Sequence, residues 1–222
     1  MTVLDCGCGN GASAEYLRAA GFETFGVDVA DFRAEQWTER SELPGVHLLL
    51  ADAIALPFPD HYFDIVFSCG MLEHIGVAEE CTPAYRVRPL PHQADLRRSF
   101  LRESMRVLKP NGVLYVDHPN GSFPIDFWHN DYRGLPRFHW PRERFLPSFG
   151  EVYKIARGIA PTCSVEAISP AGRFTFRRSG RRWYGKLFTN VMKIYLNLLR
   201  QRPFSWLVAS PLNPYLVIRI TR

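Results

Sequence analysis

Alternating glycines directly follow the first apolar run of the chain. The stretch VLDCGCGNG, residues 3–11, places an acid before three glycines, and a helical pattern follows it. Glycine at every second position permits a tight turn that opens the backbone and the free N–H groups of the next helix to a ligand. A pyrophosphate-binding turn reads G-x-G-x-x-G instead. The spacing and the acid therefore favour a cationic ligand, such as S-adenosylmethionine, over a dinucleotide.

Two further carboxylates occur where later strand-like runs end. Asp28 closes the run in GVDVA, and Asp52 stands in ADAIALPF. A carboxylate can accept hydrogen bonds from two adjacent hydroxyl donors at once. Ligands of doubly wound sheets bind at the carboxyl ends of the strands, so we expect these acids in the same site.

Together and in this order, the segments resemble the class I S-adenosylmethionine-dependent methyltransferases, in particular the group often called type 11. The resemblance covers residues 1–120 and extends to FDIVFSCGMLEHI (63–75) and RVLKPNGVLYV (106–116). It implies S-adenosylmethionine as cofactor and S-adenosylhomocysteine as product, with Asp28 on the ribose hydroxyls and Asp52 at the adenine amino group. The expected cofactor residues are Asp5, Gly7, Gly9, Gly11, Asp28, Asp52, Ala53 and Ser68.

Strand-like runs alternate with helical patterns along the chain. Such alternation, with fully apolar strands, predicts an α/β fold with a single doubly wound, mostly parallel seven-stranded sheet. The expected helices include 95–108 and 183–199. The expected strands are 2–6, 22–29, 46–50, 63–68, 113–116, 163–168 and 215–220.

We expect one domain over residues 1–222, in three parts. Residues 1–120 form the cofactor-binding core, 121–145 a lid or substrate segment, and 146–222 the helices and strands that complete the sheet. Prolines and glycines predict a loop at 79–93 and a turn at 109–112.

Methyl transfer is a displacement at a sulfonium carbon, so the enzyme must align the acceptor and in some cases remove its proton. Histidine titrates near working pH. His118 directly follows the fifth strand and is the first choice for a general base; His74 is the second. The alternative is that each histidine simply hydrogen-bonds a loop, and the Glu-His pair at 73–74 also resembles a structural helix start.

The segment 121–144 is rich in aromatic residues. We expect Trp128, His129, Tyr132 and His139 to contact the substrate, although such loops also simply pack against a sheet. No ligand spacing in the sequence indicates a metal site.

Charge is unevenly distributed. Net charge is +5, and residues 151–222 hold 13 Lys and Arg against two acids, Glu151 and Glu166. A basic half suits an acidic acceptor or peripheral contact with a membrane surface, whereas nucleic acid is not expected without interleaved aromatics. Five cysteines without regular spacing, and no signal sequence, predict a cytoplasmic protein.

The sequence thus predicts methyl transfer to a small-molecule or sugar-containing acceptor, at oxygen. Two alternatives stay open. A non-catalytic, S-adenosylmethionine-binding partner subunit is one, because no helices precede the first strand; a homo-oligomer is also compatible. A methyltransferase acting on RNA ribose, which would bind RNA through residues 173–186, is the other.

Overall fold

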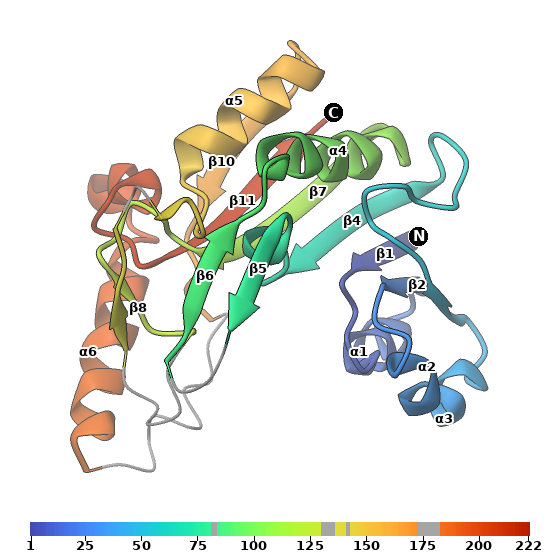
Figure 1. Cartoon of the computed structure of the whole chain (residues 1–222), viewed down its shortest axis with the longest axis horizontal. Coiled ribbons are helices and arrows are strands. Elements are labelled where there is room, and N and C mark those ends of the chain that lie inside the picture. Colours follow the sequence, from blue (N-terminus) through green and yellow to red (C-terminus); the bar gives the residue numbers. More distant parts are fainter. Residues whose placement is uncertain (81–83, 130–135, 141–142, 173–182) are drawn as a thin grey trace.

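The computed structural model describes residues 1–80, 84–129, 136–140, 143–172 and 183–222. Its centre is a seven-stranded sheet in the order β10-β11-β7-β4-β1-β2-β3 (Figure 1). All neighbours pair in parallel except β11, which is antiparallel to both β7 and β10. The predicted mostly parallel, doubly wound sheet is confirmed. The strands are β1 (Thr2–Cys6), β2 (Glu23–Asp28), β3 (Val46–Leu50), β4 (Phe63–Cys69), β7 (Leu108–Pro119), β10 (Ser164–Ile168) and β11 (Tyr215–Thr221).

Helices cover both faces of the sheet. The longer ones are α1 (Ala12–Ala19), α4 (Gln93–Arg106), α5 (Phe149–Ile159) and α6 (Trp183–Leu198), and the shorter ones are α2 (Arg33–Gln36), α3 (Thr38–Ser41), η1 (Leu72–His74) and η4 (Arg202–Ala209). In the part of the chain that the structure describes, none of the helices is long and apolar enough to cross a bilayer.

Side chains along β1 point alternately to the two faces of the sheet. Leu4 and Cys6 lie in the main core with Phe100 and Leu101 of α4. Asp5, between them, points to the other face and accepts a hydrogen bond from Ser13 of α1. Successive side chains of a strand point to opposite faces, so this single strand anchors a helix on each side.

Three predicted irregular segments contain strands. The predicted loop 79–93 is wrong in part, because β5 (Val77–Glu80) and β6 (Arg86–Pro89) pair as an antiparallel hairpin. The predicted turn at 109–112 lies inside β7, where the register against β4 shifts between Phe63 and Ile65. In the segment 121–145, β8 (Ile125–Asp126) pairs with β9 (Arg137–Phe138). Pairing with a partner strand overrides the local preference of Pro for turns in the hairpin, whereas residues 109–112 have no partner in the register and bulge out of the strand, with Asn111 at a φ of 64°.

Arg97 of α4 is a fully enclosed cation, 1% exposed. Its guanidinium donates to Glu151 of α5 at 2.9 Å, to the carbonyl of Glu73 at 3.2 Å and to the carbonyl of Phe145. One side chain therefore joins α4, α5, η1 and the segment that follows β9.

Replacing Arg97 with methionine should lower the free energy of unfolding by about 2–4 kcal/mol, because two buried carbonyls lose their donor. Denaturant titration measures the change. Arg98→Met, one residue along the same helix and exposed, serves as the control and should shift it by less than about 0.5 kcal/mol. Equal losses in the two variants would contradict the assignment.

Candidate functional site

The glycine-rich turn follows β1 in the chain and is hydrogen-bonded to the end of β2. Gly7, Gly9 and Gly11 all have positive φ, at 79°, 57° and 76°, a conformation that side chains disfavour. The amides of Gly7 and Cys8 donate to the carbonyl of Val27 at 2.8 and 3.0 Å. The turn is thus folded back onto the strand that carries Asp28.

Asp28 fastens this turn from the end of β2. One carboxylate oxygen accepts from the amide of Gly9 at 2.9 Å and the other from the amide of Ala30 at 3.0 Å. Trp37 covers the same turn, donating from Nε1 to the carbonyl of Gly9 at 2.9 Å. The structure therefore brings the predicted glycines and the predicted ribose acid into one unit.

The remaining expected cofactor residues surround the same edge. Asp5 is buried and holds Ser13. Asp52 is exposed and accepts from the amide of Ile54 at 3.0 Å, and Ala53 beside it is buried. Ser68 is 1% exposed, and its hydroxyl has no hydrogen-bond partner among the described residues.

His118 is enclosed rather than presented at the site. It is 0% exposed, and Nδ1 donates to the carbonyl of Pro119 at 2.8 Å. Burial, together with the charge of the nearby Arg97, lowers its pKa to about 4. Asp117, its neighbour on β7, faces the other side and accepts from Tyr215 at 2.5 Å. The surroundings of His118 do not support our first choice of general base.

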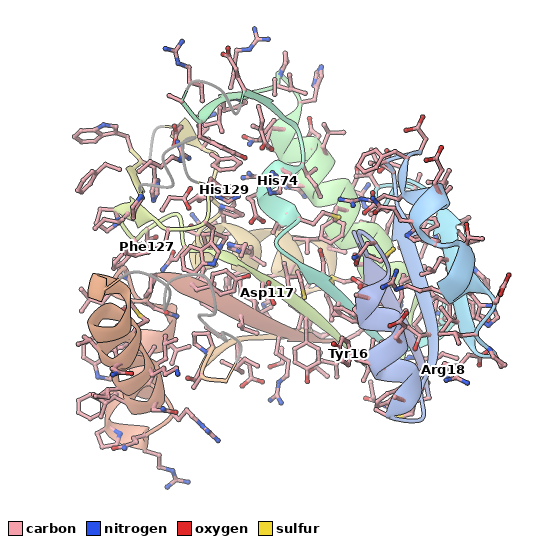
Figure 2. All side chains as sticks on the ribbon, turned by 90° about the horizontal axis from the view of Figure 1, so that it is seen from below. Tyr16, Arg18, His74, Asp117, Phe127 and His129 are labelled. Carbon is pink, nitrogen blue, oxygen red and sulfur yellow. The ribbon has the colours of Figure 1, made fainter. Side chains whose placement is uncertain are left out.

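His74 and His129 form a pair at the exit of β4. They come from η1 and from the residues after β8, and Figure 2 shows them side by side. Their Nε2 atoms lie 3.4 Å apart, and Nε2 of His129 lies 3.9 Å from the buried carboxylate of Glu73. The structure thus joins a predicted base to a predicted substrate residue.

Each ring of this pair is held from behind by a carboxylate. Nδ1 of His74 bonds Glu79 at 2.5 Å, and Nδ1 of His129 bonds Asp126 at 2.9 Å. Asp126 also accepts from Arg137 at 3.2 Å and from the amides of Trp128 and His129. Sequence reasoning placed Glu73 among the polar groups of this edge without giving it a role, and it missed Glu79 and Asp126. The only local signal for these two was Asp126, three residues before His129.

Burial and neighbouring charge act on these groups in opposite directions. Burial raises the pKa of Glu73 to about 7. Burial alone would lower the pKa of His74, but the hydrogen bond to Glu79 and the surrounding acids outweigh it and raise that pKa. Burial of Asp126 is likewise outweighed by the bond and charge of His129, which lower its pKa to about 2.

Met71, three residues before His74, connects the segment of the pair to the cofactor turn. Met71, between β4 and η1, packs on the turn so closely that a Cβ at Gly7 would lie 2.6 Å from its sulfur. The amide of Gly70 donates to the carbonyl of Asp117 at 2.9 Å. The ends of β1, β4 and β7 are therefore in direct contact beside the histidines.

The other residues expected to contact the substrate lie outside the histidine pair. His139 is buried and bonds the carbonyl of Phe123. Trp128 is exposed and lies beside Tyr215, with ring centroids 4.8 Å apart. Tyr132 and most of the segment 173–186 lie outside the described residues.

Comparison with known proteins matches residues 4–116 to the family described as a methyltransferase domain. The 2-methyl-6-phytyl-1,4-hydroquinone methyltransferase of Synechocystis sp. is 30% identical over 172 residues, which are 74% of this chain and 46% of that protein. The phthiotriol/phenolphthiotriol dimycocerosates methyltransferase of Mycobacterium tuberculosis is 31% identical over 140 residues, 60% of this chain and 43% of that protein. The chain thus spans about half the length of the curated relatives it matches.

A solved structure shows the same fold. Haemonchus contortus phosphoethanolamine N-methyltransferase 2, in complex with S-adenosyl-L-methionine, aligns with a TM-score of 0.57 at 17% identity. The alignment covers 100% of this chain and 48% of the other.

His118 should make the protein more sensitive to acid. Its folded pKa of about 4 lies below the ordinary value of 6.5, so the unfolded chain binds the extra proton between these pH values and stability is lost as pH falls through that window. Relative to His118→Asn, the wild-type free energy of unfolding should drop by about 3 kcal/mol from pH 7 to pH 4.

Denaturant titrations across this pH range measure the difference. The exposed His92 provides the matched control, since the His92→Asn curve should run parallel to that of the wild type. Parallel curves for wild type and His118→Asn would show that His118 does not titrate in this way.

Proposed function

The chain belongs to the family of S-adenosylmethionine-dependent methyltransferase domains, and from this premise we propose that it transfers the cofactor's methyl group to a hydroxyl oxygen of a small molecule. The single observation that carries the proposal is the packing of Met71, three residues before His74, on the glycine-rich turn. This packing places the segment that carries the histidine pair beside the proposed cofactor turn, at the same edge of the sheet.

The cofactor half of the site is supported by the backbone of the turn. Its three glycines have positive φ and add no side chains to the surface of the turn, and Asp28 lies partly exposed beside them. In the proposed complex, Asp28 receives the ribose hydroxyls and Asp52 lies near the adenine. The cofactor would supply the methyl group to an acceptor bound at this edge of the sheet.

The acceptor half is supported by the histidines. The acceptor oxygen attacks the methyl carbon as the bond from carbon to sulfur breaks, and S-adenosylhomocysteine leaves as a neutral thioether. The hydroxyl proton goes to the pair, with His74 as the base because its side chain is 37% exposed, unlike that of the enclosed His118. Glu79 behind the ring stabilises the imidazolium that forms.

The acceptor class follows from the relatives and from charge. The Synechocystis and mycobacterial relatives carry a hydroquinone, a phenol or a triol in their names. We therefore propose a phenolic or polyhydroxylated acceptor, including sugar-containing ones. The basic C-terminal half favours acceptors that carry an acidic group.

Asp28→Ala should abolish binding of S-adenosylmethionine and S-adenosylhomocysteine, because it removes the ribose acceptor and frees the amide of Gly9. Calorimetric titration measures both ligands. The exposed Asp31, three residues on, provides the control, and Asp31→Ala should bind as the wild type does. A well-folded wild type that binds neither ligand would overturn the proposal.

His74→Ala should slow methyl transfer about 10²–10⁴-fold while cofactor affinity stays unchanged, because the base acts only on the acceptor. A panel of hydroquinones, phenols and sugar acids, supplied with methyl-labelled cofactor, gives the rate. His92→Ala is the control at an exposed histidine. Mass spectrometry and NMR of the product distinguish transfer to oxygen from transfer to a ring carbon, and a carbon product would overturn the assignment to oxygen.

A further inference from the structure

Two imidazole rings and one buried carboxylate converge beside the exit of β4. The ligand-type atoms of Glu73, His74 and His129 all lie within 4.8 Å of one another. Residues 73 and 74 come from η1, whereas His129 reaches the same point from the segment after β8 (Figure 2). Two separate parts of the chain therefore supply the cluster.

Both histidines direct the same ring nitrogen into the cluster. A carboxylate only accepts hydrogen bonds, so Nδ1 of His129 carries the hydrogen in its bond to Asp126, and Nδ1 of His74 does so towards Glu79. In a neutral ring the other nitrogen, Nε2, then has a free lone pair. Two such lone pairs 3.4 Å apart repel each other unless a proton or a metal ion lies between them.

The carboxylate of Glu73 independently indicates that the cluster binds a further group. It is 1% exposed, and within the described residues its Oε2 atom has no hydrogen-bond partner. Buried polar atoms are nearly always satisfied, and buried charges are paired or coordinate metal ions. The neighbouring oxygen, Oε1, is the one that lies 3.9 Å from Nε2 of His129.

We propose that Glu73, His74 and His129 bind one divalent transition-metal ion, and that Zn²⁺ suits the site best. Two imidazoles and one carboxylate form a ligand set that Zn²⁺ favours, with a fourth position left for a solvent or substrate oxygen. Bonds of about 2.0–2.1 Å in a tetrahedral site place ligand atoms about 3.3 Å apart, close to the separation of the two nitrogens.

The groups behind the ligands match those of metal sites. Ligating histidines normally donate their second ring N–H to a carboxylate, which fixes the ring and strengthens the ligand. Asp126 does this for His129 and Glu79 for His74. Arg137 and the hydroxyl of Tyr85 in turn hold these two carboxylates. Both rings are therefore oriented before any ion arrives.

The ion would also change how the acceptor is activated, a role that rests on the proposed function. An acceptor hydroxyl in the open position loses its proton more readily because the ion stabilises the oxyanion. The two Nε2 atoms then act as ligands and the proton leaves to solvent. Metal binding itself does not depend on this role.

The test is calorimetric titration of Zn²⁺ into the chelator-treated full chain, in a Cys69→Ser background because Cys69 is an exposed thiol. One ion per chain is expected. Glu73→Gln and His129→Asn should each weaken binding at least about 100-fold, and Asp126→Asn about 10–100-fold. Co²⁺ should give the absorption bands of a tetrahedral site without thiolate charge transfer.

His92→Asn, at an exposed histidine, is the control and should bind Zn²⁺ as the background chain does. Circular dichroism checks that each variant is folded, and Asp126→Asn tests the site where a ligand variant does not fold. No stoichiometric binding, or binding that survives Glu73→Gln and His129→Asn, would overturn the metal site in favour of a shared proton between the rings. Zn²⁺ binding by a chain that does not bind S-adenosylmethionine would instead overturn the proposed function alone.

Discussion

Parallel pairing of β1 with β2 on one side and with β4 on the other is the constraint that positions everything else in this protein. Because parallel strands end at the same edge of a sheet, the glycine-rich turn, Asp28 and the η1 segment must meet there. Backbone hydrogen bonds then fix the turn on β2: the amides of Gly7 and Cys8 donate to Val27, and the amide of Gly9 donates to Asp28. The proposed cofactor surface is therefore formed by a backbone turn whose conformation these bonds fix.

Buried charge gives the second half of the site its shape. Arg97 holds the carbonyls of Glu73 and Phe145 from the interior, so the turn after β4 is fixed by a helix that lies behind it. Asp126 fixes His129 from the opposite side, using two backbone amides and Arg137 as well. Such enclosed charges are costly to bury unless each is paired, and here the pairing positions the two histidines.

The cofactor turn and the histidine cluster differ in how far apart in the sequence their residues lie. The cofactor turn is held by bonds that span at most 28 residues, whereas the histidine cluster joins residues 73 and 74 to residue 129 across the β5–β6 hairpin. One fold can support many functions, because function depends on the side chains of the site and not on the fold alone. The specificity of this chain is therefore expected to lie in the cluster and in the segment that carries His129.

The sequence alone determined the sheet, its strands to within a few residues, and the cofactor turn, because alternating apolar runs and a dense glycine motif act locally. It also placed His74 and His129 among the candidates, but as unrelated residues. Only the tertiary structure decided that they face each other, that Glu73 joins them, and that His118 is sealed inside. These outcomes depend on burial and on contacts between distant segments, such as 55 residues between the two rings. Neither spacing nor periodicity along a chain encodes such contacts.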